Sequence, residues 1–441
     1  MKLTHIKSST VVIESNNVKV LCDPWLFDGE YYGSWYHYPQ LKIDDDYFKS
    51  IDYIYVSHIH PDHFSRKTFA YLDKSIPVLI HRYEAKFLKF NLEKLGFIVT
   101  ELTNDEPYTL INDFHINIIA ADYCNPELCS KFFGCGIVEA KYGSTQIDSL
   151  AVFSDGTKTV LNVNDCPYEL AKTALFNVKE RYGHIDLALV GYAGAGPFPQ
   201  CFELSDEIKI EKAESKQKQF IDQGIKYIQA INPEYFMPFA GTYVLGGRLA
   251  ELNAYRGVPE IADALNVMSN HVNAHGILLN TYYTFDLYNP DDLEVYEPIC
   301  IDTKNDYIKN VLSKKPLDYE LHQPPNLASL LNLIPPAFER FLQKRKEIQF
   351  SSETFVVIWL NDLLKVQFQC NSDSYTFSSN GDPLPDCFVS YKVDSKLLYE
   401  ILKGPRYAHW NNAEIGSHIQ FVREPNIFER GLYHSMNFFH S

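Results

Sequence analysis

The chain has 441 residues, of which 46% are hydrophobic and 22% are charged, values typical of a globular protein with a large buried core. Its 40 basic and 56 acidic residues give a formal net charge of −16, which argues against nucleic-acid binding because that function needs a cationic face. An apolar run of about 18 residues and an apolar signal core are both absent from the sequence. We therefore expect no transmembrane segment. Nine cysteines at irregular spacing do not form a disulfide framework, so we expect a cytoplasmic protein.

Short runs rich in β-branched residues dominate the beginning of the chain. They predict strands at residues 11–13 and 18–21, joined by a polar turn, and a further strand at residues 51–56. Strand and helix signals then alternate, which is typical of a layered α/β or α+β domain. Further strands are expected at residues 78–81, 98–101, 115–120, 149–153, 159–163 and 187–190, and helices at residues 65–72, 84–95, 168–182 and 208–231.

The composition changes near residue 300. The polar residues 314–325 and the pair Pro335-Pro336 are typical of a linker region, because proline interrupts helices and strands. We therefore predict two domains, residues 1–305 and a small α+β domain at residues 306–441. In the second domain the pattern predicts antiparallel strands at residues 355–360, 364–370 and 387–392 and a helix at residues 395–402.

Metal-binding side chains are concentrated in residues 57–64, which read Ser-His-Ile-His-Pro-Asp-His-Phe directly after a predicted strand. Positions two apart in an extended segment point to the same side, so His58 and His60 can face one metal ion. The proline that follows favours a turn, which brings Asp62 and His63 toward a neighbouring position. Imidazole nitrogens and a carboxylate suit zinc or iron. A chance cluster in a solvated loop is the alternative.

This string resembles the signature of the metallo-β-lactamase superfamily. The resemblance implies an αββα sandwich, an α+β fold, with metal ligands at His58, His60, Asp62 and His63. It also implies that Asp165, at the end of a predicted strand, completes the metal site. Upstream, Asp23 matches the aspartate that supports the metal loop from behind the ligands.

Two histidines of the superfamily pattern are absent from this sequence. Residues 120–127 read Ala-Ala-Asp-Tyr-Cys-Asn-Pro-Glu where the third-motif histidine belongs, and Ala240 stands where the last-motif histidine would follow a proline. Either the site holds one metal ion, or Asp122, His271 or His275 supplies replacements. His271 and His275 are four residues apart, so they can share one helical face.

The chain more specifically resembles the catalytic part of CMP-N-acetylneuraminate hydroxylase-like proteins. This resemblance implies a hydroxylase-like oxidation of a small molecule on one or two iron ions, with electrons received through a Rieske cluster. A Rieske site needs C-x-H and C-x-x-H pairs, and none of the nine cysteines has a histidine at either spacing. We therefore expect a separate electron-transfer protein. The sequence segments that carry the resemblance to these hydroxylase-like proteins are residues 23–26, 58–63, 125–127, 161–166, 194–199 and 238–241.

Two other functions are kept as alternatives. The chain also resembles N-acylphosphatidylethanolamine-hydrolysing phospholipase D, which implies a zinc-type hydrolase of a phosphodiester or amide with Asp62 orienting the attacking water. A degenerate binding protein is the second alternative, because two ligands of the pattern are absent. Metal analysis separates these functions.

Two features outside the metal motif have two interpretations each. The aromatic residues 31–38 either wall a substrate pocket or pack within an ordinary loop. Residues 306–441 faintly resemble a sterol-carrier-protein-like fold around an apolar cavity, or they form a helper domain that shields or dimerises the first domain.

Overall fold

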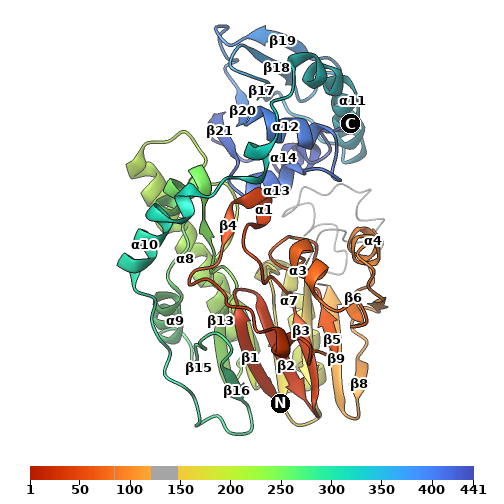
Figure 1. Ribbon diagram of the computed structural model, residues 1–441, viewed down its shortest axis with the longest axis vertical. Coiled ribbons are helices and arrows are strands. Elements are labelled where there is room, and N and C mark those ends of the chain that lie inside the picture. Colours follow the sequence, from red (N-terminus) through yellow and green to blue (C-terminus); the bar gives the residue numbers. More distant parts are fainter. Residues whose placement is uncertain (84, 121–147) are drawn as a thin grey trace.

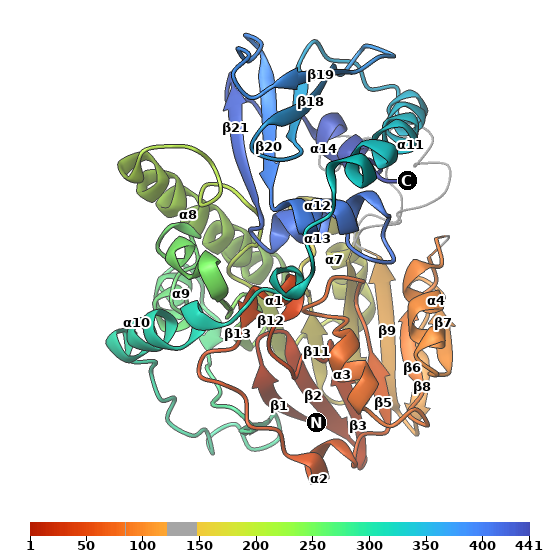
Figure 2. The same ribbon diagram turned by 45° about the horizontal axis from the view of Figure 1, so that its top comes forward.

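The computed structural model describes residues 1–83, 85–120 and 148–441. Asp122, one of the predicted ligands, lies outside these residues. Within the described ranges, two seven-stranded sheets form the body of the molecule and a five-stranded sheet formed by residues near the C-terminus lies above them (Figures 1 and 2). The predicted αββα arrangement is confirmed.

The first sheet begins with antiparallel hairpins and continues with parallel strands. The predicted strands at residues 11–13 and 18–21 pair across the turn, as Val12 opposite Leu21 shows. The order is β16 (Thr284–Asp286), β1 (Lys2–Lys7), β2 (Thr10–Ser15), β3 (Val18–Cys22), β5 (Tyr53–Tyr55), β6 (Val78–His81) and β7 (Val99–Leu102), and the neighbours β3, β5, β6 and β7 are parallel.

The second sheet mixes the two pairing modes in the same way. Its strands β8 to β11 are antiparallel neighbours, and β11, β12, β13 and β15 are parallel. The order is β15 (His275–Gly276), β13 (Tyr235–Phe239), β12 (Leu187–Gly191), β11 (Thr159–Asn162), β10 (Ser149–Ser154), β9 (Phe114–Ala120) and β8 (Tyr108–Ile111).

Alternating side chains divide each sheet between two layers of core. Val11 and Ile13 face the second sheet, whereas Val12 between them faces the helices. In the second sheet Leu189 points inward to the same shared core, and Val190 points outward. Each fully buried aliphatic side chain of this kind stabilises the fold by about 1.5–3 kcal/mol.

Helices cover the outer face of each sheet, and Figure 2 shows α3 and α4 over the first sheet. Helix α3 begins as predicted at Ser65, whose hydroxyl accepts a hydrogen bond from Thr68 N–H at 3.1 Å. No helix in the described part of the chain has both the length and the apolar character needed to cross a membrane. The first sheet packs against α2 (Asp45–Phe48), α3 (Arg66–Tyr71) and α4 (Phe87–Lys94), the second against α7 (Tyr168–Tyr182), α8 (Asp206–Ile231) and α9 (Ile261–Ser269).

Shorter elements connect this body to the C-terminal sheet. Strand β4 (Trp35–Tyr36) pairs with β14 (Val244–Leu245) to form a small separate ribbon. The other connecting elements are α1 (Glu30–Gly33), η1 (Gly247–Tyr255), α10 (Ile301–Asn310), η2 (Leu312–Lys314) and η3 (Asp318–Leu321).

The C-terminal sheet contains the strands that the sequence predicted in this region, but the prediction that all three are antiparallel is wrong, because β17 and β20 pair in parallel. Among its described strands only β17 and β20 are parallel neighbours. The order is β19 (Thr376–Ser379), β18 (Leu364–Gln369), β17 (Phe355–Trp359), β20 (Phe388–Val393) and β21 (Ile419–Glu424), and the helices are α11 (Leu327–Glu347), α12 (Ser395–Leu402), α13 (Trp410–Ile415) and α14 (Arg430–Met436).

The interpretation of Pro335-Pro336 as part of a linker is wrong. Both prolines lie inside α11. They lack the N–H groups that would bond to the carbonyls four residues earlier, which weakens the helix. The buried face of α11, including Ile334, Phe338 and Phe341, packs in the C-terminal core and outweighs that loss.

The N-terminal and C-terminal parts of the chain are in contact. Phe202 stacks on Phe421 of β21 with ring centroids 4.9 Å apart and an interplanar angle of 12°. Leu317 and Tyr319 also belong to the C-terminal core cluster. The division into residues 1–305 and 306–441 stays a proposal, and its boundary falls inside α10.

Glu414, on α13, provides a test of how burial of a carboxyl group affects stability. It is 3% exposed, and its Oε2 has no hydrogen-bond partner among the described residues. Burial raises the pKa of Glu414 from 4.5 to about 8. Between these values the native state keeps a proton that the unfolded chain releases, so the stability that this group contributes falls as the pH rises.

We expect Glu414→Gln to raise the free energy of unfolding at pH 8 by more than about 1.4 kcal/mol, the value of one pKa unit. The amide is neutral throughout, so near pH 4 the variant and the parent protein should be about equally stable. Urea unfolding at both pH values measures the difference. Glu339→Gln, on the exposed side of α11, is the matched control and should show no such pH dependence.

Candidate metal centre

The three motif histidines lie in the loop that follows β5. His58 and His63 are buried, and His60 is half-buried. His58 Nε2 lies 2.9 Å from His60 Nδ1, and the ring centroids of His58 and His63 are 4.2 Å apart. The structure therefore brings the three imidazoles close together.

Carboxylates from neighbouring strand ends complete this histidine cluster. Asp165 follows β11 and Asp148 directly precedes β10, so the sheet topology brings both to the edge where β5 ends. Of the three groups of described residues whose ligand atoms lie within 4.8 Å of one another, two include His58: one adds His60 and Asp148, the other His63 and Asp165. Sharing His58 makes them a single cluster of nitrogen and oxygen donors.

Asp23 fixes the orientation of His63 from behind. The carboxylate is fully buried and accepts hydrogen bonds from Ser57 N–H at 2.7 Å and from the Ser57 hydroxyl at 2.8 Å. His63 Nδ1 lies 2.9 Å from Asp23 Oδ2. With Nδ1 engaged, Nε2 faces the cluster, which is the supporting role the resemblance implies for Asp23.

His63 Nε2 itself has no hydrogen bond in the described structure, although it is buried. It lies 3.5 Å from Asp62 Oδ2 and 3.4 Å from Asp165 Oδ2. A buried polar atom without a partner is costly, and a cation between the imidazole and these carboxylates removes that cost. The donor set therefore fits a transition-metal ion such as iron or zinc.

The electrostatics of the cluster also favour a bound cation. Burial, and then the neighbouring Asp165, raise the pKa of Asp148 well above its ordinary range. Burial, and then His63 and His60, lower the pKa of His58. The neighbouring carboxylates Asp165, Asp62 and Asp23 outweigh burial and raise the pKa of His63 well above its ordinary value, so they favour a positive charge at this position, which a divalent ion can supply.

Two residues that touch the cluster, Asp148 and Asn411, were missed by the sequence analysis, and Tyr31 was considered there only as part of the aromatic stretch. Asp148 Oδ1 lies 3.3 Å from His58 Nδ1, and Asn411 Oδ1 of α13 lies 3.0 Å from His60 Nε2. The Tyr31 hydroxyl donates a hydrogen bond to Asp62 Oδ1 at 2.5 Å. Asp148 and Asn411 lie in no recognisable motif, so only the folded chain reveals them.

Most of the aromatic stretch at residues 31–38 is core. Trp35 is 1% exposed and stacks on Tyr243 with centroids 3.4 Å apart and an interplanar angle of 6°. Tyr31 is also buried, but its hydroxyl reaches the cluster through Asp62. The structure therefore favours loop packing for Trp35 and a supporting contact for Tyr31.

His271 and His275 lie away from the cluster. His275, in β15, pairs with Tyr235 at the start of β13, whereas Ala240 follows the end of that strand. At about 3.3 Å per residue, some 16 Å of strand separates the two ends. His271 is exposed, and its Nδ1 lies 2.8 Å from the carbonyl oxygen of Val267 in α9. Neither histidine takes the place of the two that the pattern lacks.

Residues 2–124 match the family model described as a beta-lactamase superfamily domain. Over these residues the chain is similar to the beta-lactamase superfamily. The matched residues include Asp23 and the histidine motif, and the described sheets provide the two-layer core that this fold requires. The metallo-β-lactamase fold thus accounts for the position of the cluster at the end of β5.

Curated relatives include proteins named for a Rieske 2Fe-2S centre and cytidine monophosphate-N-acetylneuraminic acid hydroxylases. One Rieske-named protein, from Mycolicibacterium smegmatis, is 30% identical over 267 residues, which cover 59% of this chain and 47% of the relative. Another, from Mycobacterium tuberculosis H37Rv, is 28% identical, and the match covers 63% of this chain and 51% of the relative. The hydroxylase of Danio rerio is 25% identical, and the match covers 55% of this chain and 38% of the relative. The chain spans about half the length of the first relatives or less.

Solved structures with a similar arrangement include both hydrolases and a hydroxylase. An isothiocyanate hydrolase from Delia radicum gut bacteria has a TM-score of 0.46 at 13% identity and covers 65% of this chain and 99% of its own. CmlA, a diiron β-hydroxylase from Streptomyces venezuelae, has a TM-score of 0.38 at 14% identity, and the match covers 64% of this chain and 53% of CmlA. These likenesses are too distant to bear on the reaction.

Proposed function

We propose that this protein is a metal-dependent enzyme that hydroxylates a small molecule at an iron site, with electrons from a separate Rieske-type protein. The observation that carries the proposal is the cluster of three imidazoles and several carboxylates around His63 Nε2, which is buried, makes no hydrogen bond among the described residues and lies between Asp62 and Asp165. Similarity to hydroxylases and to Rieske-named proteins favours oxidation over hydrolysis. In the reaction, a C–H bond, O₂, two electrons and two protons yield C–OH and water.

The proposed ligands are His58, His60, His63, Asp165 and Asp62, joined by Asp148. When bound, one or two iron ions supply the one-electron chemistry that O₂ reduction requires. The protein's own contribution is to keep His58 neutral and to hold the imidazoles oriented and sheltered from bulk water. Burial does the first, since it is the largest cause of the lowered pKa of His58.

Asp62 is the proposed proton-handling group. Tyr31 engages its Oδ1, so Oδ2 is the oxygen that faces His63 at 3.5 Å. An oriented carboxylate oxygen beside the ligands can accept a proton from a bound water or substrate group. Removing the tyrosine hydroxyl would free Asp62 to rotate away from that position.

A zinc-type hydrolase is the second candidate. The same Asp62 oxygen can orient an attacking water, and no cysteine of the printed sequence has the spacing to histidine that a Rieske site needs. A degenerate binding protein is the third candidate, since Ala240 stands at the place of a ligand in the superfamily pattern. We also propose a cytoplasmic location, because no disulfide joins the cysteines of the described residues.

Anaerobic purification followed by elemental analysis distinguishes the three candidates. We expect one or two iron ions per chain, and oxygen uptake with dithionite-reduced protein that exceeds the uptake of a His58→Ala/His60→Ala variant. Zinc with turnover of bis(p-nitrophenyl) phosphate would overturn the hydroxylase in favour of the hydrolase. Protein that binds no stoichiometric metal under metal-replete conditions would leave only the binding protein.

A further inference from the structure

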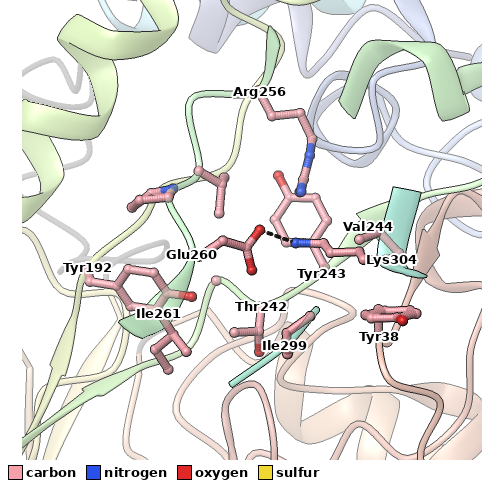
Figure 3. Close-up of a pocket in the computed structure, with 13 residues that line it drawn as sticks. Tyr38, Tyr192, Thr242, Tyr243, Val244, Arg256, Glu260, Ile261, Ile299 and Lys304 are labelled. Atoms are coloured by element: carbon pink, nitrogen blue, oxygen red, sulfur yellow. Dashed lines mark hydrogen bonds and ion pairs between the residues drawn. The ribbon is translucent and has the colours of Figure 1, made fainter. Parts of the chain in front are cut away.

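A small cavity lies beside the segment that follows β13, and no side chain of the histidine cluster lines it. The centre of a water-sized group can move through about 20 Å³ of this space. Figure 3 shows that three stretches of chain build its walls, residues 241–244, 256–261 and 299–304, together with Tyr38 and Tyr192.

Arg256 is the unusual feature of this cavity. The side chain is 5% exposed, and its Nε and Nη1 have no hydrogen-bond partner among the described residues. Its guanidinium carbon lies 4.3 Å from the centroid of the Tyr243 ring. In Figure 3 Arg256 is drawn above that ring. An arginine keeps its charge when buried, and a ring face supplies only part of what the lost water provided. The guanidinium therefore lacks an anion.

The other charges around the cavity do not supply this anion. The acidic side chain on its wall, Glu260, forms an ion pair with Lys304, drawn as a dashed line in Figure 3. No ion pair joins Arg256 to a carboxylate in the described parts of the chain. Burial, and next the nearby Arg256, lower the pKa of Lys216 to about 8. The lining thus carries one uncompensated positive charge.

Tyr192 offers a second donor. Its hydroxyl is buried and has no hydrogen-bond partner among the described residues. In Figure 3 the ring lies on the side of the cavity opposite Tyr38. A buried hydroxyl without a partner is as unexpected as the two unpartnered guanidinium nitrogens, and Tyr192 and Arg256 line the same small volume.

We propose that this pocket binds an oxyanion, the carboxylate or phosphate end of a small molecule, through Arg256 and the Tyr192 hydroxyl. A guanidinium pairs with such groups through charge-assisted hydrogen bonds. The pocket and the metal centre are linked by packed rings: Tyr243 stacks on Trp35, whose ring centroid is 4.4 Å from that of Tyr31. The proposal does not depend on the proposed function, because none of the proposed metal ligands lines the pocket.

Calorimetric titration of chelator-treated protein tests the proposal, with sodium acetate in one arm and inorganic phosphate in the other at constant ionic strength. We expect saturable binding of at least one anion with one site per chain, in the millimolar range or tighter. The arm that binds identifies the source of the oxyanion. Equal binding by the His58→Ala/His60→Ala variant shows that the anion is not held by residual metal. Failure of both anions to saturate would overturn the proposal.

Variants of the pocket connect the binding to its donors. Arg256→Met should weaken the affinity at least about tenfold and should leave the melting temperature equal or higher, because it removes an unpaired buried charge. Arg248→Met, which removes a surface charge that pairs with Asp394, is the matched control and should bind normally. Tyr192→Phe removes only the hydroxyl and should weaken binding a few-fold, so the test stands even if the arginine variant fails to fold. Unchanged affinity in both pocket variants would contradict the assignment.

Discussion

Protein in which His58 and His60 are both replaced by alanine is expected to lose its stoichiometric metal. His58 belongs to both groups of converging ligand atoms, and His60 completes one of them. The double change leaves Asp148 without an imidazole partner and should weaken metal affinity by more than about 100-fold. Elemental analysis after gel filtration measures the loss, and circular dichroism shows whether the fold persists.

The matched control is His271→Ala/His275→Ala, which also removes two imidazoles from the same chain. Both residues are exposed and lie away from the cluster, so the control should retain the full metal content. Metal bound at full stoichiometry after the His58 and His60 change, or lost to the same extent in the control, would show that the site has been placed wrongly.

The second large effect is expected at Asp23, which touches no solvent. Asp23→Asn keeps the shape of the side chain but presents an amide where Ser57 and His63 need an acceptor. We expect metal affinity to fall about 10- to 100-fold, because His63 loses the contact that holds its ring. Leaving buried donors unsatisfied should also cost about 1–3 kcal/mol of stability. Competition with a colorimetric chelator and urea unfolding measure the two effects.

Asp52→Asn is the control for this change. Asp52 also accepts a hydrogen bond from a backbone N–H, that of Lys19 at 2.8 Å, but it is exposed beside the start of β5. Its replacement should leave metal affinity unchanged and alter stability only slightly. Similar metal affinity in the Asp23 variant and the parent protein would exclude the supporting role of Asp23.

Elements with a strong local pattern were predicted well from the sequence. The alternation of Val11, Val12 and Ile13 gives strand β2 directly, because the two faces of that strand contact different cores. Helix α11 was missed because its two prolines are local signals against a helix, whereas the gain comes from packing against distant strands. The available signal was Asn326, whose side chain accepts a hydrogen bond from Ser329 N–H at 2.8 Å and caps the helix.

The candidate site likewise contains residues that a local sequence pattern predicts and residues that only the folded chain brings together. Three histidines and Asp62 lie within six residues, so spacing and family resemblance were sufficient to propose them. Asp148 and Asn411 approach the histidines only because separate strands and a distant helix converge there. No periodicity within a sequence window encodes a contact of that range, so these two partners required the folded chain.

The contact between His60 and Asn411 has a consequence for how this protein matures. The two side chains are 351 residues apart in the chain, and Asn411 is held in turn by the Tyr433 hydroxyl. A nascent polypeptide would display its histidine loop long before the helix that steadies it leaves the ribosome. The His60–Asn411 contact can therefore form only after synthesis has passed that helix, and a prematurely terminated product would carry the motif without this steadying contact.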